Sequence, residues 1–402
     1  MNKKVFSALL VVVYLVSAGV SYAVFSSGSS PLSIGSKKTA IAPVKSEVAN
    51  DFEAVLFDQS KPKTQACPLN GELYSKEQET WWLQHRPLGI MIENHTEARP
   101  QSGISFADVT YEAVAEGGIT RTLNVFYCND AGIVGPVRSA RTYFLDWISE
   151  YGDHPLYTHV GGANCVASTG SGCQNGAKAD ALGQIEKYGW LNYNDLSQFS
   201  IGFPVFKRDE ARLGREVATE HTMYSTTTKL WNVAKERGLT TKDKEGTAWT
   251  EGFVSYTFKD DAAESERGSA QALHIEFWQD PSYFVDWTYD KASNSYLRKN
   301  GGEAHMDRNT KKQLSAKTIV VMLQKESSAN DGYDHNAHLL YGNKGTGKAL
   351  IFMDGKQTSG TWSKDDRTAR TKITTSAGKE IAFNRGHLWF DIVPLDAEVS
   401  VK

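Results

Sequence analysis

Charged residues are interleaved with apolar, strand-like runs and glycine turns over a short stretch of the chain, from Glu93 to Arg141. They are Glu93, Arg99, Asp108, Glu112, Glu116, Arg121, Arg138 and Arg141. Such side chains are almost never fully buried unless they are paired, and arginine presents a planar fork that suits carboxylate or phosphate groups. A fold that sets these strands side by side gathers carboxylates and guanidiniums in one place, so we expect a site there.

The N-terminal segment has the pattern of a membrane anchor. Lys3 and Lys4 precede an uncharged apolar run from Val5 to Phe25, which is longer than the ~7–15 residues of a signal-peptide core and fits the ~17–25 of a spanning helix. The lysines predict a cytoplasmic N-terminus and a single-pass protein of the cell membrane. The alternative is cleavage near Ala23, which would give a secreted protein. Both alternatives place the rest of the chain outside the cytoplasm.

Length and charge restrict the class of protein. The 402 residues correspond to two or three domains, and a content of 40% hydrophobic and 23% charged residues is that of an ordinary folded protein. The net charge of −3 argues against nucleic acid as a partner, because such binding needs a clustered basic surface. We expect no cofactor and no bound metal.

The chain contains four cysteines, Cys67, Cys128, Cys165 and Cys173. An even number in an oxidising compartment favours disulfides. Cys165 and Cys173 flank a segment rich in glycine and serine and could close one loop, which would leave Cys67 to pair with Cys128. Three pairings remain possible on the count alone. A metal site is the weaker alternative, because the chain has no CxxC and no histidine at ligand spacing.

Composition divides the rest of the chain into three parts. Residues 26–66 read as a flexible linker in which the apolar patch Phe52–Phe57 could dock, 67–242 as an α/β domain, and 243–402 as a mainly β domain. In the α/β domain we expect strands at 88–93, 108–116, 119–128 and 156–160, with a hairpin turn at Gly117–Gly118. Helices are expected at 77–85, 139–151, 181–188 and 222–237, with Ser139 as an N-cap.

The last part of the chain alternates aromatic and polar residues in short runs separated by turn signals such as Asp354–Gly355. This pattern is typical of a mainly β domain. The expected strands are LHIEFW, YFVDWTY, SYLRK, TIVVMLQ, ALIFMDG, TKITTS, IAFN and HLWFDIVP. Core packing is the simplest explanation of their alternating Trp and Tyr residues.

Three other motifs are better explained by structure than by chemistry. Gly342–Lys348 has the spacing of a phosphate-binding loop but is followed by Ala349 and a strand, so we expect a hairpin turn. The segment with Asp331, Asp334, His335 and His338 is polar and reads as a solvated loop. Ser139 is not in a G-x-S-x-G elbow.

Histidines and carboxylates supply the catalytic candidates. His159 ends a predicted strand before two glycines, where backbone can approach a ligand closely, and His221 lies near an expected helix start. Each alone is more often a satisfied core histidine. Together with Glu93 and Glu116 they are the candidates for acid and base chemistry.

The runs RPQSGISFADVTYEAVAEGGITR, GPVRSARTYF and HVGG resemble the YerB-like family, whose members are described as bacterial lipoproteins of unknown function. The later runs GKALIFMDGKQTSGTWSKDD and IAFNRGHLWFDIVP resemble the C-terminal half of that family. The resemblance extends from Pro87 to Pro394. It implies an exported, surface-anchored bacterial protein of two domains and supplies no activity. No cysteine follows the apolar segment before Cys67, so a protein anchor replaces the lipid.

Our leading hypothesis is a module of the cell envelope that binds a cell-wall polymer or another anionic molecule. The expected ligand-binding residues are Glu93, Asn94, Arg99, Glu112, Glu116, Arg121, Arg138, Arg141 and His159. One alternative is a hydrolase of glycosidic or phosphodiester bonds with paired carboxylates. Another is a scaffold for protein partners in the envelope.

Overall fold

The computed structural model describes residues 52–164, 178–269, 272–332 and 337–401. The predicted anchor, most of the predicted linker, and both Cys165 and Cys173 lie outside these ranges. Among the described residues, no helix combines the length and the apolar character needed to cross a bilayer.

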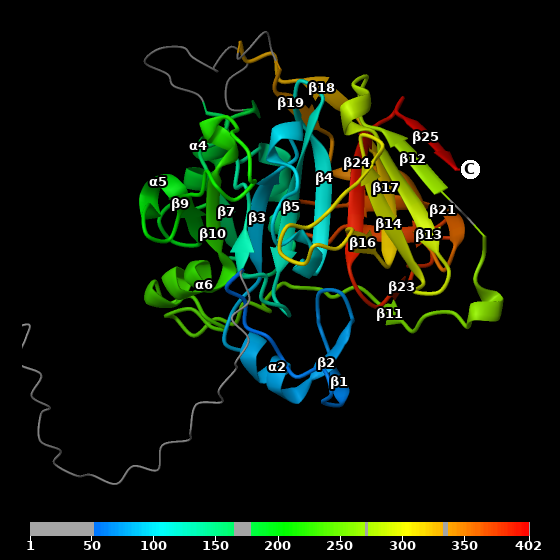
Figure 1. Ribbon diagram of the computed structural model, residues 1–402, viewed down its shortest axis with the longest axis horizontal. Helices are drawn as coiled ribbons and strands as arrows, with labels where there is room; N and C mark the ends of the chain where they lie inside the picture. The colour runs from blue at the N-terminus through cyan, green and yellow to red at the C-terminus, as the bar shows by residue number, and fades with distance from the viewer. Residues whose placement is uncertain (1–51, 165–177, 270–271, 333–336, 402) are drawn as a thin grey trace, which may run out of the picture. The chain divides into compact units, whose positions relative to one another are not determined.

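A ten-stranded sheet forms the centre of the fold, with the strand order β22-β21-β20-β17-β24-β4-β5-β3-β7-β8 (Figure 1). The first half of the chain supplies β3 (Leu88–Glu93), β4 (Val109–Glu116), β5 (Ile119–Phe126), β7 (Leu156–His159) and β8 (Asp195–Ser197). The second half supplies β17 (Thr318–Gln324), β20 (Gly345–Met353), β21 (Lys356–Lys364), β22 (Lys372–Thr375) and β24 (Leu388–Pro394). One sheet therefore contains strands from both halves of the chain.

The junction between the halves is the parallel pairing of β24 with β4, in which Phe390 lies opposite Tyr111. On its other edge β24 pairs in parallel with β17. The central strands are buried on both faces, and successive side chains enter different cores because a strand alternates its faces. Met91 packs in one hydrophobic cluster and Ile90 and Ile92 in the other.

A second sheet covers part of one face, as the yellow strands in Figure 1 show. Its members are β12 (Ala272–Glu276), β13 (Val285–Asp290), β14 (Ser295–Asn300), β15 (Glu303–Ala304), β16 (Ser315–Ala316) and β25 (Glu398–Val401). Strand β13 alternates between buried and more exposed positions, which puts Val285, Trp287 and Tyr289 in the core. The alternating aromatic residues of β13 are therefore packing residues, as expected, whereas Trp278 after β12 is 44% exposed.

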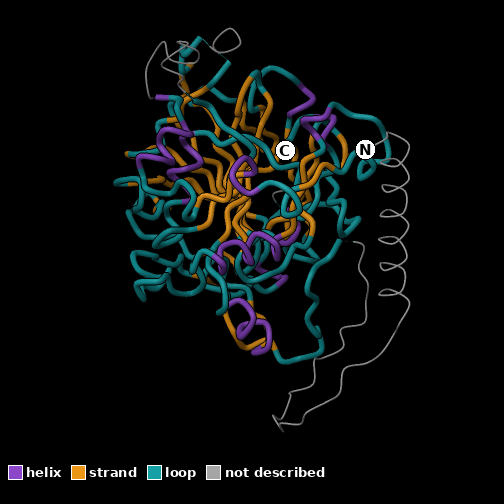
Figure 2. Tube along the Cα trace, turned by 90° about the vertical axis from the view of Figure 1, so that its left-hand side faces the viewer, coloured by secondary structure: helices purple, strands orange, loops and turns teal. Residues whose placement is uncertain are grey.

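Short helices and small ladders surround the central strands, which occupy the middle of the folded unit in Figure 2. The α-helices are α2 (Lys76–Trp82), α3 (Thr142–Ile148), α4 (Ala181–Lys187), α5 (Gln198–Ile201) and α6 (Thr227–Glu236). The minor strands are β1 (Lys63–Ala66), β2 (Leu73–Ser75), β6 (Ile133–Val134), β9 (Lys207–Arg208), β10 (Met223–Thr226), β11 (Phe258–Lys259), β18 (Glu326–Ser328), β19 (Leu339–Tyr341) and β23 (Phe383–Asn384). The 3-10 turns are η1 (Thr96–Ala98), η2 (Ile104–Phe106), η4 (Thr219–His221), η5 (Glu264–Glu266) and η6 (Pro281–Tyr283).

The predicted fold class is confirmed: a mixed α/β region is followed by a mainly β region. The hairpin at Gly117–Gly118 is also confirmed, since β4 and β5 pair on either side of it. Cys67 and Cys128 form a disulfide across 61 positions, with their Cα atoms 6.0 Å apart. Tyr127 and Cys128 both donate their backbone N–H groups to the buried carboxylate of Asp108, which therefore has a structural role.

Several local predictions were wrong. Lys63–Ala66, placed in the linker, is strand β1. The apolar patch does dock as expected, since the Phe52 ring lies against Phe106 with centroids 5.8 Å apart and a tilt of 35°. Ser139 caps no helix, because residues 137–140 run extended and α3 begins only after Arg141. The last predicted helix begins at Thr227 instead of 222, since β10 precedes it and Thr226 provides the cap.

Two motifs also need correction or refinement. Strand β21 was not predicted, because its sequence is polar and most of its residues are exposed or half-buried. The glycine-rich segment from Gly345 to Lys348, expected in a hairpin turn, is instead the first part of β20 and pairs with β21, and it forms no phosphate-binding loop. Asp331 and His338, expected in a solvated loop, are buried and lie 2.7 Å apart between Oδ2 and Nδ1. Asp334 and His335 lie outside the described residues.

Candidate functional site

Strand register brings three of the predicted site residues, Glu93, Glu116 and Arg121, to one end of the large sheet. Strands β3 and β5 are antiparallel, which sets Glu93 opposite Arg121, while β4 ends at Glu116 beside the start of β5. The segment that carries Arg138 lies beside the end of β3. Val137 bridges to Ile92, and the Arg138 N–H donates to the Met91 carbonyl at 2.9 Å.

Three guanidiniums gather around Glu116, and we call Glu116, Arg121, Arg138 and Arg141 the arginine cluster. Arg121 Nη2 is 3.0 Å from Glu116 Oε1, and Arg141 Nη2 bonds the other carboxylate oxygen. The remaining terminal nitrogens of Arg121 and Arg141 donate to the carbonyls of Ser139 and Ala140. Their buried Nε atoms have no hydrogen-bond partner among the described residues.

Neighbouring arginines keep the carboxylate of Glu116 ionised. Burial opposes ionisation, but the guanidiniums of Arg121, Arg141 and Arg138 together hold the pKa of Glu116 at about 2. This carboxylate is therefore ionised at neutral pH. His338, which the sequence gave no reason to place here, lies 3.9 Å from Glu116 between Nε2 and Oε2.

Arg138 differs from the other two arginines because its side chain is 23% exposed. Its Nε lies 3.0 Å from Glu93 Oε1 in an ion pair that lacks hydrogen-bond geometry, and no hydrogen bond joins its Nη1 or Nη2 to any residue in the described ranges. The main chain of Arg138 is fixed by backbone hydrogen bonds, since the Val160 N–H donates to the Arg138 carbonyl at 3.0 Å. The terminal fork of the Arg138 guanidinium is therefore available to a ligand.

Glu93 connects Arg138 to His221. The other oxygen of this buried carboxylate is 2.8 Å from His221 Nδ1. The hydrogen bond that His221 donates to Glu93 raises the pKa of His221, although burial opposes the shift. His221 comes from η4, and its ring stacks on that of His95 with centroids 4.6 Å apart. The two catalytic candidates Glu93 and His221 are therefore in direct contact.

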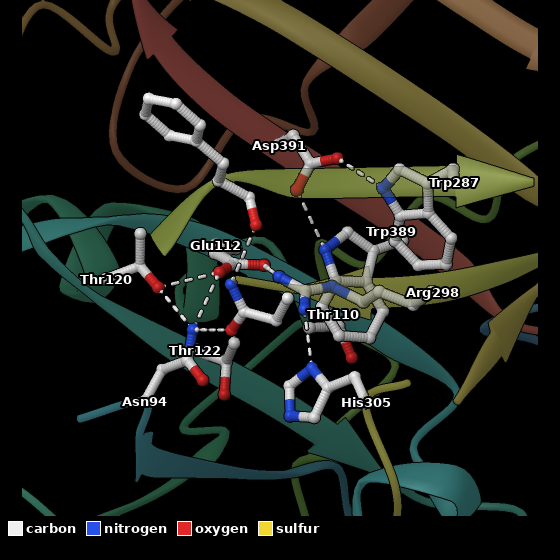
Figure 3. Close-up of polar contacts among 12 residues, drawn as sticks. Asn94, Thr110, Glu112, Thr120, Thr122, Trp287, Arg298, His305, Trp389 and Asp391 are labelled. Atoms are coloured by element: carbon white, nitrogen blue, oxygen red, sulfur yellow. Dashed lines mark hydrogen bonds and ion pairs between the residues drawn. The ribbon is translucent and has the colours of Figure 1, made fainter. Parts of the chain in front are cut away.

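Glu112 is separate from the arginine cluster and belongs to an interior network (Figure 3). Its carboxylate lies 2.6 Å from Arg298 Nη2 of β14, and both side chains are fully buried. Thr120 donates to Glu112 at 2.7 Å. The Arg298 guanidinium lies over Trp389, 5.0 Å from the ring centroid, and its distance to Trp287 is 5.6 Å. Loss of one member of such a buried pair typically costs about 3–5 kcal/mol.

Asn94 and Arg99 extend this network between the two halves of the chain. Asn94 Nδ2 donates to Thr120 at 2.7 Å and to Asn300 of β14 at 2.8 Å. Arg99 donates to the Asn94 side chain at 3.1 Å and to the Ser282 carbonyl at 2.9 Å. Both residues tie the first half of the chain to the second.

Asp391 completes the interior network from β24. Its carboxyl oxygens accept hydrogen bonds from the indoles of Trp287, at 3.2 Å, and Trp389, at 2.9 Å (Figure 3). Burial and the charge of Glu112 raise the pKa of Asp391, while Arg298 acts in the opposite direction. Sequence reasoning missed Arg298 and Asp391, because nothing local marks a partner so distant along the chain.

His159 lies at the end of β7, and both of its ring nitrogens have hydrogen-bond partners. Its Nε2 is 2.8 Å from Asp195 Oδ1, and its Nδ1 is 2.5 Å from the Gly161 carbonyl. Both His159 and Asp195 are 1% exposed. The pair fastens β7 to β8, and neither ring nitrogen is available to a ligand in this arrangement.

Comparison with known proteins identifies the family. The N-terminal domain of the protein family of unknown function DUF3048 matches residues 69–240, and its C-terminal domain matches residues 273–390. The chain belongs to this family. It is 27% identical over 315 residues to a Bacillus subtilis (strain 168) protein named "Putative lipoprotein YerB". The alignment covers 78% of this chain and 83% of that protein.

A solved structure supports the fold. The crystal structure of the YerB protein from Bacillus subtilis aligns with a TM-score of 0.65 at 24% identity, over 84% of this chain and 100% of that chain. The DUF3048 fold is thus shared, and the expected resemblance is confirmed.

Proposed function

We propose that this protein is an extracytoplasmic, membrane-attached protein of the cell envelope that binds an anionic group through Arg138. One observation carries the proposal: the Arg138 side chain is partly exposed and faces Glu93 through Nε at 3.0 Å, with its terminal fork available. A guanidinium fork matches the geometry of phosphate or carboxylate and binds it through two parallel hydrogen bonds.

The charges around Arg138 favour an anion. Arg121 and Arg141 are neutralised in part by the single carboxylate of Glu116, and Arg138 shares Glu93 with His221. The three guanidiniums thus outnumber the two carboxylates that pair with them. Attachment outside the cytoplasm is inferred from the apolar run Val5–Phe25 and from the name of the Bacillus subtilis relative.

A hydrolase has less support. A general acid must carry a proton near the working pH, whereas Glu116 stays ionised because its pKa is about 2. A scaffold role has less support: Trp278 of the β region is 44% exposed, but Trp287, Trp362 and Trp389 are buried.

The test is binding of defined anions to the purified full chain. The probes are inorganic phosphate, a glycerol-phosphate polymer and a carboxylate-bearing cell-wall glycan fragment, followed by calorimetry and thermal unfolding. A ligand at a hundredfold excess over Kd stabilises the native state by about 2.7 kcal/mol. We expect Arg138→Gln to lower the affinity at least tenfold, and Arg138→Lys to restore it only in part, because lysine lacks the fork.

Arg385→Gln is the matched control. Arg385 is also partly exposed, and it also pairs with a carboxylate through Nε, at 2.8 Å from Asp260. Its loss should leave the affinity unchanged. Equal binding by wild type and Arg138→Gln, or no binding of any probe, would contradict the proposal.

A further inference from the structure

Lys259, Asp354 and Asn384 form a closed triangle of polar side chains outside the arginine cluster. Lys259 Nζ lies 2.6 Å from Asp354 Oδ2 and also bonds the side-chain oxygen of Asn384. Asn384 Nδ2 donates to the other oxygen of Asp354 at 2.6 Å. Each residue therefore contacts the other two, and an amine, a carboxylate and a carboxamide meet at one place.

The backbone brings this triangle together from segments that are far apart in the sequence. Strands β11 and β23 pair in parallel and set Lys259 directly opposite Asn384, 125 positions later (Figure 1). Lys259 lies in the connection between the residues that match the two family domains, and Asn384 lies in the C-terminal one. Asp354 comes from the turn between β20 and β21. The triangle thus joins the connection to the C-terminal domain.

The carboxylate of Asp354 is held in place from several sides. It also accepts hydrogen bonds from Asn294 Nδ2 at 2.7 Å and from the Ala262 N–H at 3.2 Å. The Tyr289 hydroxyl donates to the Asn294 side chain at 2.7 Å and fixes it in turn. Asn294 and Asn384 are fully buried. Groups that are already fixed beside one another need no further ordering before they react, which is the main advantage of intramolecular reactions.

This arrangement contains the parts needed to join an amine to a carboxamide. Lys259 Nζ forms a bond to Asn384 Cγ, the Cγ–Nδ2 bond breaks, and the two protons that Nζ gives up leave with Nδ2 as an ammonium ion. A base must take a proton from the attacking nitrogen, and an acid must give one to the departing nitrogen. The two oxygens of Asp354 contact these two nitrogens. One carboxylate can therefore carry the proton from one to the other.

The resting state of the triangle determines how fast such a reaction proceeds. Burial opposes ionisation of Asp354, but hydrogen bonds from Lys259 and from two asparagines hold its pKa at about 2. The ion pair with Lys259 is therefore the starting state, and transfer of a proton to Asp354 is uphill. The reaction is slow for this reason, but it needs to take place only once in each chain.

From this geometry we propose that Lys259 and Asn384 become joined by an intramolecular amide bond, with Asp354 as the residue that transfers the proton. The bond ties the connection between the two family domains to β23, the strand that precedes β24. The proposal does not depend on anion binding, since none of the three residues belongs to the arginine cluster.

The experiment is a peptide map by mass spectrometry of the purified full chain, after prolonged incubation at neutral pH and reduction of the disulfides. We expect a branched peptide that contains Lys259 and Asn384, with the mass of its two parts less one ammonia. Lys259→Arg, which keeps the positive charge, should abolish this peptide. Asp354→Asn should lower its yield at least tenfold. On a denaturing gel with reductant, the wild type should migrate faster than Lys259→Arg, because the loop between the joined residues stays closed.

Lys317 provides a matched control. Its Nζ is also 2.6 Å from a carboxylate, that of Asp261, and it also bonds the Ser293 carbonyl. In the part of the chain that the structure describes, no carboxamide side chain bonds this amine. Lys317→Arg should therefore leave the branched peptide unchanged.

Absence of the branched peptide from the wild type would overturn the proposal and would show an ordinary ion pair, and this measurement needs no variant. A link from Lys259 to Asp354, with loss of water, would overturn the assignment to Asn384. Formation at an unchanged rate in Asp354→Asn would overturn the role of the carboxylate. The anion test and the peptide map are separate measurements, so failure of one leaves the other standing.

Discussion

Glu112 and Glu116 are two carboxylates of the same strand with different surroundings. Glu112 is paired with Arg298 in the interior, whereas Glu116 lies at the end of β4, partly exposed, with three arginines and His338 around it. The sequence marked both as site residues, because both are charged and lie in an apolar strand. Burial and the partner decide their roles, and for Glu112 the partner is 186 positions away.

The depressed pKa of Glu116 predicts a contribution to acid stability. Because the folded pKa of about 2 is below the ordinary value of 4.5, the contribution is complete above pH 4.5. It is lost as the pH falls from 4.5 toward 2, and its upper limit is about 3 kcal/mol. The difference in unfolding free energy between wild type and Glu116→Gln should therefore shrink over this range in urea titrations. A difference that is the same at pH 5 and pH 2.5 would contradict the assignment of charge.

Among the elements, those defined by local signals were predictable and those defined by distant partners were not. The β4–β5 hairpin follows from Gly117–Gly118, and β3 from its continuous apolar run. Strand β21 has a polar sequence and is identifiable only from its pairing with β20. The arginine cluster was found because its members are close in sequence, but His338 was missed, since a polar segment gives no sign that it folds against Glu116.

Strand β3 packs closely against α3 at Gly89, and this contact predicts the effect of a larger side chain there. A Cβ at Gly89 would lie 2.5 Å from Ile148 Cδ1, so Gly89→Ala should destabilise the fold by about 1–3 kcal/mol through overpacking. Ile148→Val removes that Cδ1 atom and should recover part of the loss in the double variant. Gly342→Ala, where the nearest atom is 3.5 Å away, is the control. Chemical denaturation measures all four variants, and additive losses in the double variant would refute the clash.

The whole molecule is held together by β24, which lies between β17 and β4 in one sheet. The interior network of Glu112, Arg298 and Asp391 crosses the same junction. Because neither half completes its sheet alone, the two family domains should unfold together.

Differential scanning calorimetry of the full chain tests this expectation. We expect a single transition whose calorimetric and van't Hoff enthalpies agree, which is the criterion for two-state unfolding. Fluorescence and circular dichroism should give the same midpoint. Two resolved transitions, or a fragment ending at residue 269 that unfolds cooperatively by itself, would show that the halves are independent.

The position of β24 in the sequence also determines when the large sheet can be completed during synthesis. Synthesis proceeds from the N-terminus, so β4 emerges long before residues Leu388–Asp391, which pair with its free side. Until then β4 has an unpaired edge, and exposed edges recruit strands from other chains. A nascent chain that stalls before Leu388 keeps this edge open, so the sheet is closed against aggregation only when β24, which follows its other nine strands in the sequence, has been made.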